Sequence, residues 1–139
     1  MMAPGQTSEW GIAPDTDAIE AIARDTMARL PHAFRQHLDA IVFRVEDLAD
    51  DETLEALGID DPFQLSGLYS GRPVGEKSVA ESGALPDMIF LYRRALLDEW
   101  IETGETLEAL VTHVLVHEVG HHFGLSDADM HALEEAAGT

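Results

Sequence analysis

A predicted helix from about Thr106 to Phe123 carries two histidines and a glutamate among mostly apolar residues. Its apolar side chains recur at the spacing of one helical face. They are Leu107, Leu110, Val111, Val114 and Leu115. Gly124 follows at a position where helices commonly end in the left-handed conformation. Because such a stripe packs against a core, this helix constrains the fold of the chain more than any other segment.

The end of this helix and the residues after it read HEVGHHFGLSD, residues 117–127. His117 and His121 are four residues apart, so both side chains lie on one helical face and can reach a single ion. Glu118 adjoins His117 and can reach water bound to that ion. Gly124 lets the chain fold back, and Asp127 then lies where a third ligand is needed. The pattern HExxHxxGxxD therefore predicts a metal site.

Chance produces all five fixed residues of this pattern about 0.0003 times in a chain of this composition. Zinc in a catalytic site binds three protein ligands and keeps one position for water. The ion lowers the pKa of that water towards ~7, and Glu118 would accept its proton and pass it to the leaving amine. Two histidine ligands disfavour oxygen-only cations such as calcium. We therefore expect one zinc ion per chain.

The rest of the chain predicts helices and strands in alternation. A helix from about residue 17 begins with a capping box of Asp17 and Glu20 and ends before Pro31. Helical segments are also expected at 32–39, 51–57, 94–101 and 127–136, and strands at 40–46 and 87–93. Residues 1–14 are expected to form a flexible leader, and 15–139 a single domain.

Glycines and prolines punctuate residues 59–86. A connection of this length without structure is uncommon in so small a domain. We therefore expect it to carry function or to contain short strands.

Three segments resemble the small bacterial proteins identified as minimal zincin-like metallopeptidases, and the glycine and third ligand resemble the metzincin branch. They are GLYSGRP (67–73), LPDMIFLYRRAL (85–96) and VTHVLVHEVGHHFGLSDADM (111–130). The resemblance spans roughly residues 17–136 and implies a compact α+β fold, a zincin-like domain in which a small mixed sheet packs on the motif helix. It also implies His117, His121 and Asp127 as zinc ligands and Glu118 as general base. By the same resemblance, strand 87–93 would offer an edge to an extended substrate.

Other residues compete for the third ligand position. Ser126 and Asp129 could form a capping box that leaves Asp127 as a first-turn acid, and Asp129 is the next candidate ligand. Glu134 and Glu135 are conceivable ligands but lie close behind the motif. His113, one turn before His117, is expected to support or pack rather than ligate. His122 is expected to point sideways and not to bind metal.

Candidates for contacts with the substrate lie outside the motif. Tyr69 and Tyr92 could each donate a hydrogen bond to an oxyanion, although packing is the ordinary role of such tyrosines. Arg72 and Lys77 could bind a substrate carboxylate, although surface charge is their ordinary role.

Composition limits the partners. With 27 acidic and 8 basic residues the formal charge is −19, which repels nucleic-acid phosphates and anionic membranes. The lack of cysteine excludes disulfides, thiolate zinc sites and cysteine nucleophiles. No basic, apolar leader typical of a signal peptide and no apolar run of ~18 residues is found. We expect a cytoplasmic protein, and the sequence leaves its oligomeric state open.

These observations predict a zinc-dependent hydrolase, and most specifically a metallopeptidase acting on short or unfolded peptides. The alternatives are a non-catalytic metal-binding or interaction module on a zincin-like scaffold, and a hydrolase of other amides. Glu118 separates enzyme from scaffold, because a structural zinc site needs no carboxylate beside its first ligand and usually has four protein ligands.

Overall fold

The structure is a computed structural model that describes residues 11–71 and 87–137. Most of the leader expected at 1–14 lies outside these ranges, as do Arg72 and Lys77. The helices are α1 (Thr16–Arg29), α2 (His32–Leu38), α3 (Asp51–Leu57), η1 (Pro62–Gln64), α4 (Arg93–Thr103), α5 (Leu107–Phe123) and α6 (Asp127–Ala136). The strands are β1 (Val42–Glu46), β2 (Gly67–Ser70) and β3 (Met88–Tyr92).

The three strands form a mixed sheet in the order β1-β3-β2. β1 pairs with β3 in parallel, with Val42 opposite Met88, and β2 pairs antiparallel to β3, with Gly67 opposite Leu91. The predicted α+β fold with a small mixed sheet is thereby confirmed. The proposed edge at 87–93 is wrong, because β3 has a neighbour on each side and its backbone groups are already paired. An added strand could pair only with an outer strand of this sheet.

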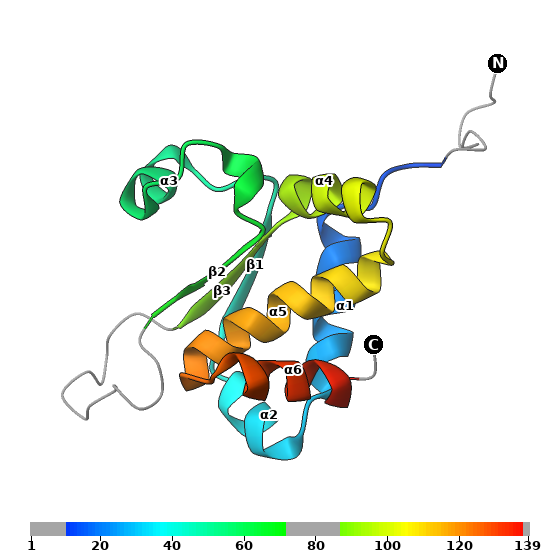
Figure 1. The fold of residues 1–139 in the computed structure, drawn as a ribbon, viewed down its shortest axis with the longest axis vertical. Helices are drawn as coiled ribbons and strands as arrows, with labels where there is room; N and C mark the ends of the chain where they lie inside the picture. Colours follow the sequence, from blue (N-terminus) through cyan, green and yellow to red (C-terminus); the bar gives the residue numbers. More distant parts are fainter. Residues whose placement is uncertain (1–10, 72–86, 138–139) are drawn as a thin grey trace.

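Helix α5 lies against one face of this sheet, and α1 and α6 pack beside it. Figure 1 shows α5 crossing the molecule diagonally, with α6 directly below it. The side chains of Ile89 and Leu91 on β3 and of Val111 and Leu115 on α5 are fully buried in the shared core. Alternation along β3 puts Phe90 and Tyr92 on the other sheet face, where a second cluster contains Leu54 of α3.

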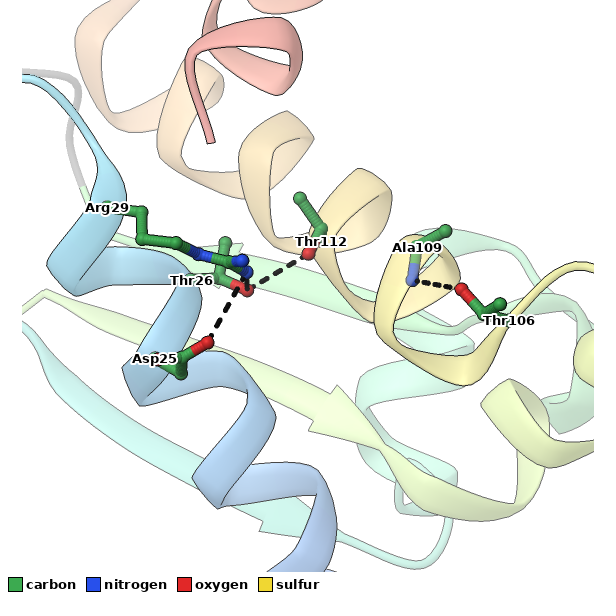
Figure 2. Close-up of polar contacts among 6 residues, drawn as sticks. All are labelled: Asp25, Thr26, Arg29, Thr106, Ala109 and Thr112. Carbon is green, nitrogen blue, oxygen red and sulfur yellow. Dashed lines mark hydrogen bonds and ion pairs between the residues drawn. The ribbon is translucent and has the colours of Figure 1, made fainter. Parts of the chain in front are cut away.

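A buried hydrogen bond joins α1 to α5 in the middle of this core. The hydroxyl oxygens of Thr26 and Thr112 lie 2.9 Å apart, and both residues are fully buried. Arg29 reaches the Thr26 hydroxyl and also contacts Asp25, as Figure 2 shows. Because a buried hydroxyl without a partner is costly, this pair fixes how α1 and α5 align.

The helix boundaries follow local capping signals. Gly58 and Gly124 end α3 and α5 in the left-handed conformation, as predicted. The predicted capping box at Asp17 and Glu20 is wrong, because Asp15 is the N-cap of α1 and its carboxylate accepts from the Ala18 N–H at 2.8 Å. Asp17 lies instead in the first turn, where a negative charge also favours the helix.

The irregular segment expected at 59–86 contains the short helix η1 and the strand β2 in its described part, which confirms the prediction of hidden strands. Strand β2 carries Tyr69. Among the described residues, no helix combines the length and the apolar character needed to cross a membrane.

Candidate metal centre and active site

The motif helix α5 is defined at both ends by its own sequence. The Thr106 side chain accepts a hydrogen bond from the Ala109 N–H at 3.1 Å, and the Gly124 N–H donates to the His121 carbonyl at 3.2 Å. The helix is unbroken between these caps. His117 and His121 are therefore one turn apart, as predicted.

Glu118 is the buried acidic residue of the site, with a side chain 11% exposed. One of its carboxylate oxygens, Oε2, lies 3.3 Å from Nδ1 of His121. The backbone N–H of Tyr69 also donates to this carboxylate. Burial raises the pKa of Glu118, and the neighbouring His121, the Tyr69 N–H and His117 oppose that rise. The carboxylate is thus held between the motif histidines and strand β2.

Strand β2 can come this close to α5 because Gly67 has no side chain. A Cβ at Gly67 would lie 2.6 Å from Cγ1 of Val114 and 3.4 Å from Cγ of Glu118. Any larger residue would push the strand away from the helix. The sequence predicted neither this approach nor the role of the Tyr69 backbone.

The two motif histidines differ in exposure. The His121 side chain is 57% exposed, whereas His117 is half-buried. The ring of His117 lies 4.4 Å from the ring of His113, centroid to centroid. His113, expected to support or pack, therefore does contact a predicted ligand.

Asp127 is exposed and is the first residue of α6. The side chain of Ser126 caps this helix by accepting from the Asp129 N–H at 3.2 Å. The alternative expected from the sequence, a Ser126 cap with Asp127 as a first-turn acid, is therefore present. The reversal at Gly124, with φ of 66°, puts Asp127 directly after the motif helix. Its role as a ligand stays a prediction.

Met130 joins α6 to the motif helix. It is 5% exposed, and a Cβ on Gly120 would lie 2.2 Å from its sulfur. The methionine thus occupies the space that a side chain at Gly120 would take. This contact fixes the distance between α5 and α6. It thereby also fixes the position of Asp127, the first residue of α6.

Within residues 11–71 and 87–137, three potential ligand atoms come within 4.8 Å of one another at one place, formed by His113, His117 and Glu134. Nδ1 of His113 lies 2.7 Å from Oε1 of Glu134. The predicted set of His117, His121 and Asp127 is not drawn together to that distance. Glu135, the other acid considered, lies 3.3 Å from His131 on the surface.

His122 is buried and contacts Tyr69 of strand β2. Its Nδ1 lies 3.3 Å from the Tyr69 hydroxyl and 3.4 Å from Oδ2 of Asp87, and the residue is 3% exposed. This agrees with the expectation that the His122 side chain points in a different direction from that of His121. Sequence patterns do not predict this contact, because Tyr69 and Asp87 lie far from His122 along the chain.

The proposed oxyanion residues have different surroundings. The Tyr69 hydroxyl contacts His122. Tyr92 is 2% exposed on the sheet face away from α5, and burial raises its pKa to about 12, with smaller contributions from Glu46, Asp50 and Glu118. Arg72 lies outside the described residues. Contact of any of the three with substrate stays a prediction.

The comparison with protein families agrees with the motif. The model of the family described as zincin-like metallopeptidase matches residues 38–137, which include both outer strands, the central strand and the complete motif. No curated protein matches the chain significantly. The match to residues 38–137 confirms the family inferred from the motif and the wider sequence pattern. Zincin-like metallopeptidases are zinc-dependent peptidases. The chain belongs to the zincin-like metallopeptidases.

Proposed function

We propose that this protein is a zinc-dependent peptidase that cleaves short or unfolded peptides in the cytoplasm. The observation that carries the proposal is the buried carboxylate of Glu118, which is held between His121 and the Tyr69 N–H. A carboxylate fixed beside a pair of histidines at helical spacing is the arrangement that water activation requires. A structural metal site gains nothing from it.

The residues fit zinc by the chemistry of their donors. Two imidazoles one turn apart and a carboxylate are ligand types that zinc prefers. His117, His121 and Asp127 would hold one ion per chain. When bound, zinc would supply Lewis acidity that activates water and polarises the scissile carbonyl.

Glu118 would move the proton. Its carboxylate would accept a proton from the attacking water and deliver it to the nitrogen of the departing amine. Burial disfavours the ionised carboxylate and so makes Glu118 a stronger base than an exposed glutamate. The Tyr69 N–H would keep the carboxylate oriented through both transfers.

The size of the domain favours small substrates. The described residues form one three-stranded sheet beside α5, a smaller enclosure than the cleft between two subdomains that larger zincins use. Short or unfolded peptides need less enclosure than folded proteins, and this favours them as substrates.

Replacing Glu118 with glutamine tests the proposal. Glu118→Gln keeps size and polarity but removes the base, so peptide cleavage should fall ~10²-fold or more while the zinc content by elemental analysis stays near wild type. Glu108→Gln, at an exposed position of the same helix, is the matched control and should leave both unchanged.

The same assay decides between enzyme and scaffold. If zinc-loaded wild type cleaves nothing in a broad peptide library, the non-catalytic metal-binding module replaces the peptidase. Cleavage of other amides but not of peptides would support the hydrolase of other amides.

A further inference from the structure

His117 belongs to two histidine pairs on α5. It is four residues before His121 and four residues after His113, so each pair has the spacing that lets two imidazoles share one ion. The side chain of His117 lies against His113, with ring centroids 4.4 Å apart. Glu134 of α6 completes this second group through its contact of 2.7 Å with His113.

The surroundings of His113 and Glu134 suit a cation. A cavity of about 340 Å³ adjoins both residues, and Glu99 and Glu105 also line it. Three carboxylates around one open cavity favour positive ions over anions. The His113 side chain is 51% exposed and that of Glu134 19%, so an ion can enter from solvent and keep water as further ligands.

We propose that His113, His117 and Glu134 form a second binding site for zinc or a similar transition-metal ion, and that this site competes with the motif for His117. Two imidazoles and one carboxylate bind borderline metals such as zinc. A neutral imidazole has one nitrogen with a free lone pair. His117 can therefore serve one ion at a time, and the two arrangements exclude each other.

The competition has a definite consequence, which rests on the proposed function. Each chain binds one ion in either arrangement. At saturating zinc the share of chains with the ion at the motif depends on the ratio of the two affinities and not on the zinc concentration. An ion at the second site takes His117 away from the motif, so that Glu118 then lies beside a motif that lacks one of its ligands. The second site is then a resting position that limits the active fraction.

The test measures zinc affinity by chelator competition on full-length chains that lack one motif ligand. His121→Ala should still bind one zinc ion, because the second site is intact. Adding His113→Ala or Glu134→Gln to His121→Ala should weaken zinc binding by ~10-fold or more. Adding Asp127→Ala or His131→Ala should change it little, since neither residue belongs to the second site. Circular dichroism checks that each chain is folded.

The outcomes separate the two proposals. Equal zinc affinity of His121→Ala with and without His113→Ala overturns the second site, whatever the wild type cleaves. Loss of zinc on adding His113→Ala supports the site, even if the wild type proves to be inactive. In an active wild type, His113→Ala should raise the rate at saturating zinc without changing KM, because more chains hold the ion at the motif.

Discussion

Two carboxylates, of Glu118 and Glu134, lie near His117, and different parts of the fold hold them. Glu118, in the contact between α5 and β2, accepts a hydrogen bond from a backbone N–H that the sheet fixes in place. Glu134, in the contact between α5 and α6, meets His113 through side chains alone beside an open cavity. The first carboxylate is thus held by a backbone group of the sheet, whereas the second is held by a side chain of α5.

This difference suggests that the two contacts suit different functions. A base must already be oriented when the reaction begins, because reorganisation at that moment adds to the barrier. A group that only holds an ion can adjust as the ion arrives. The contact between α5 and β2 therefore suits proton transfer, and the contact between α5 and α6 suits cation binding.

Replacing His117 should have the largest effect, because both arrangements depend on it. Zinc at 100 times its Kd stabilises a folded protein by ~2.7 kcal/mol if it binds only the native state. His117→Ala should abolish this stabilisation, measured as the rise in Tm on adding zinc. His131→Ala is the control and should keep it. A full zinc-dependent rise in Tm in His117→Ala would contradict both sites.

Gly67→Ala breaks the contact between α5 and β2. The new methyl group would lie 2.6 Å from Cγ1 of Val114, and such overpacking should lower the free energy of unfolding by about 1–3 kcal/mol. Urea denaturation measures the loss. Adding Val114→Ala creates room, so the double variant should lose less than the sum of the two single changes. Full additivity would argue against the close approach.

Asp127→Ala tests the ligand that would link α6 to the motif. Zinc affinity should fall at least ~10-fold, which corresponds to ~1.4 kcal/mol, as measured by chelator competition. Asp129→Ala removes an acid from the same helical turn and should leave affinity nearly unchanged. Asp127→His should retain zinc, since imidazole is an equally suitable ligand. If Asp129→Ala loses the metal and Asp127→Ala does not, the assigned third ligand is wrong.

Gly120→Ala disturbs the contact between α5 and α6 and should have the smallest effect. Overlap with the Met130 sulfur costs stability, but alanine is favoured over glycine inside a helix by ~1 kcal/mol. The net loss should be ~1 kcal/mol or less in urea denaturation. In a Met130→Ala background the overlap is gone, so Gly120→Ala should become stabilising. Equal losses in both backgrounds would show that Met130 does not fill this space.

Local sequence predicted much of the fold correctly. The strand at 42–46 has the expected alternation, with Phe43 and Val45 half-buried and Arg44 exposed. Helix α3 has the predicted bounds, and α5 and α6 begin and end close to theirs. These features depend on periodicity and on capping by neighbouring residues, which act within a few positions along the chain.

The errors and omissions share one cause. The central place of β3, the close approach at Gly67 and the burial of His122 all depend on residues brought from elsewhere in the chain. Strand β2 has four residues, too few for a clear alternation. Its position at Glu118 depends on pairing with β3 and packing on Val114.

By itself the sequence determined the motif helix, the spacing of His117 and His121, the turn at Gly124 and, through the motif and the wider pattern, the family. Helical geometry puts His117 and His121 on one face from their spacing alone. Only the tertiary structure decided that Glu118 is buried against the Tyr69 N–H, and that His113 and Glu134 meet beside His117. The two contacts join residues 49 and 21 positions apart, and packing of the sheet and of α6 on α5, rather than local propensity, brings them together.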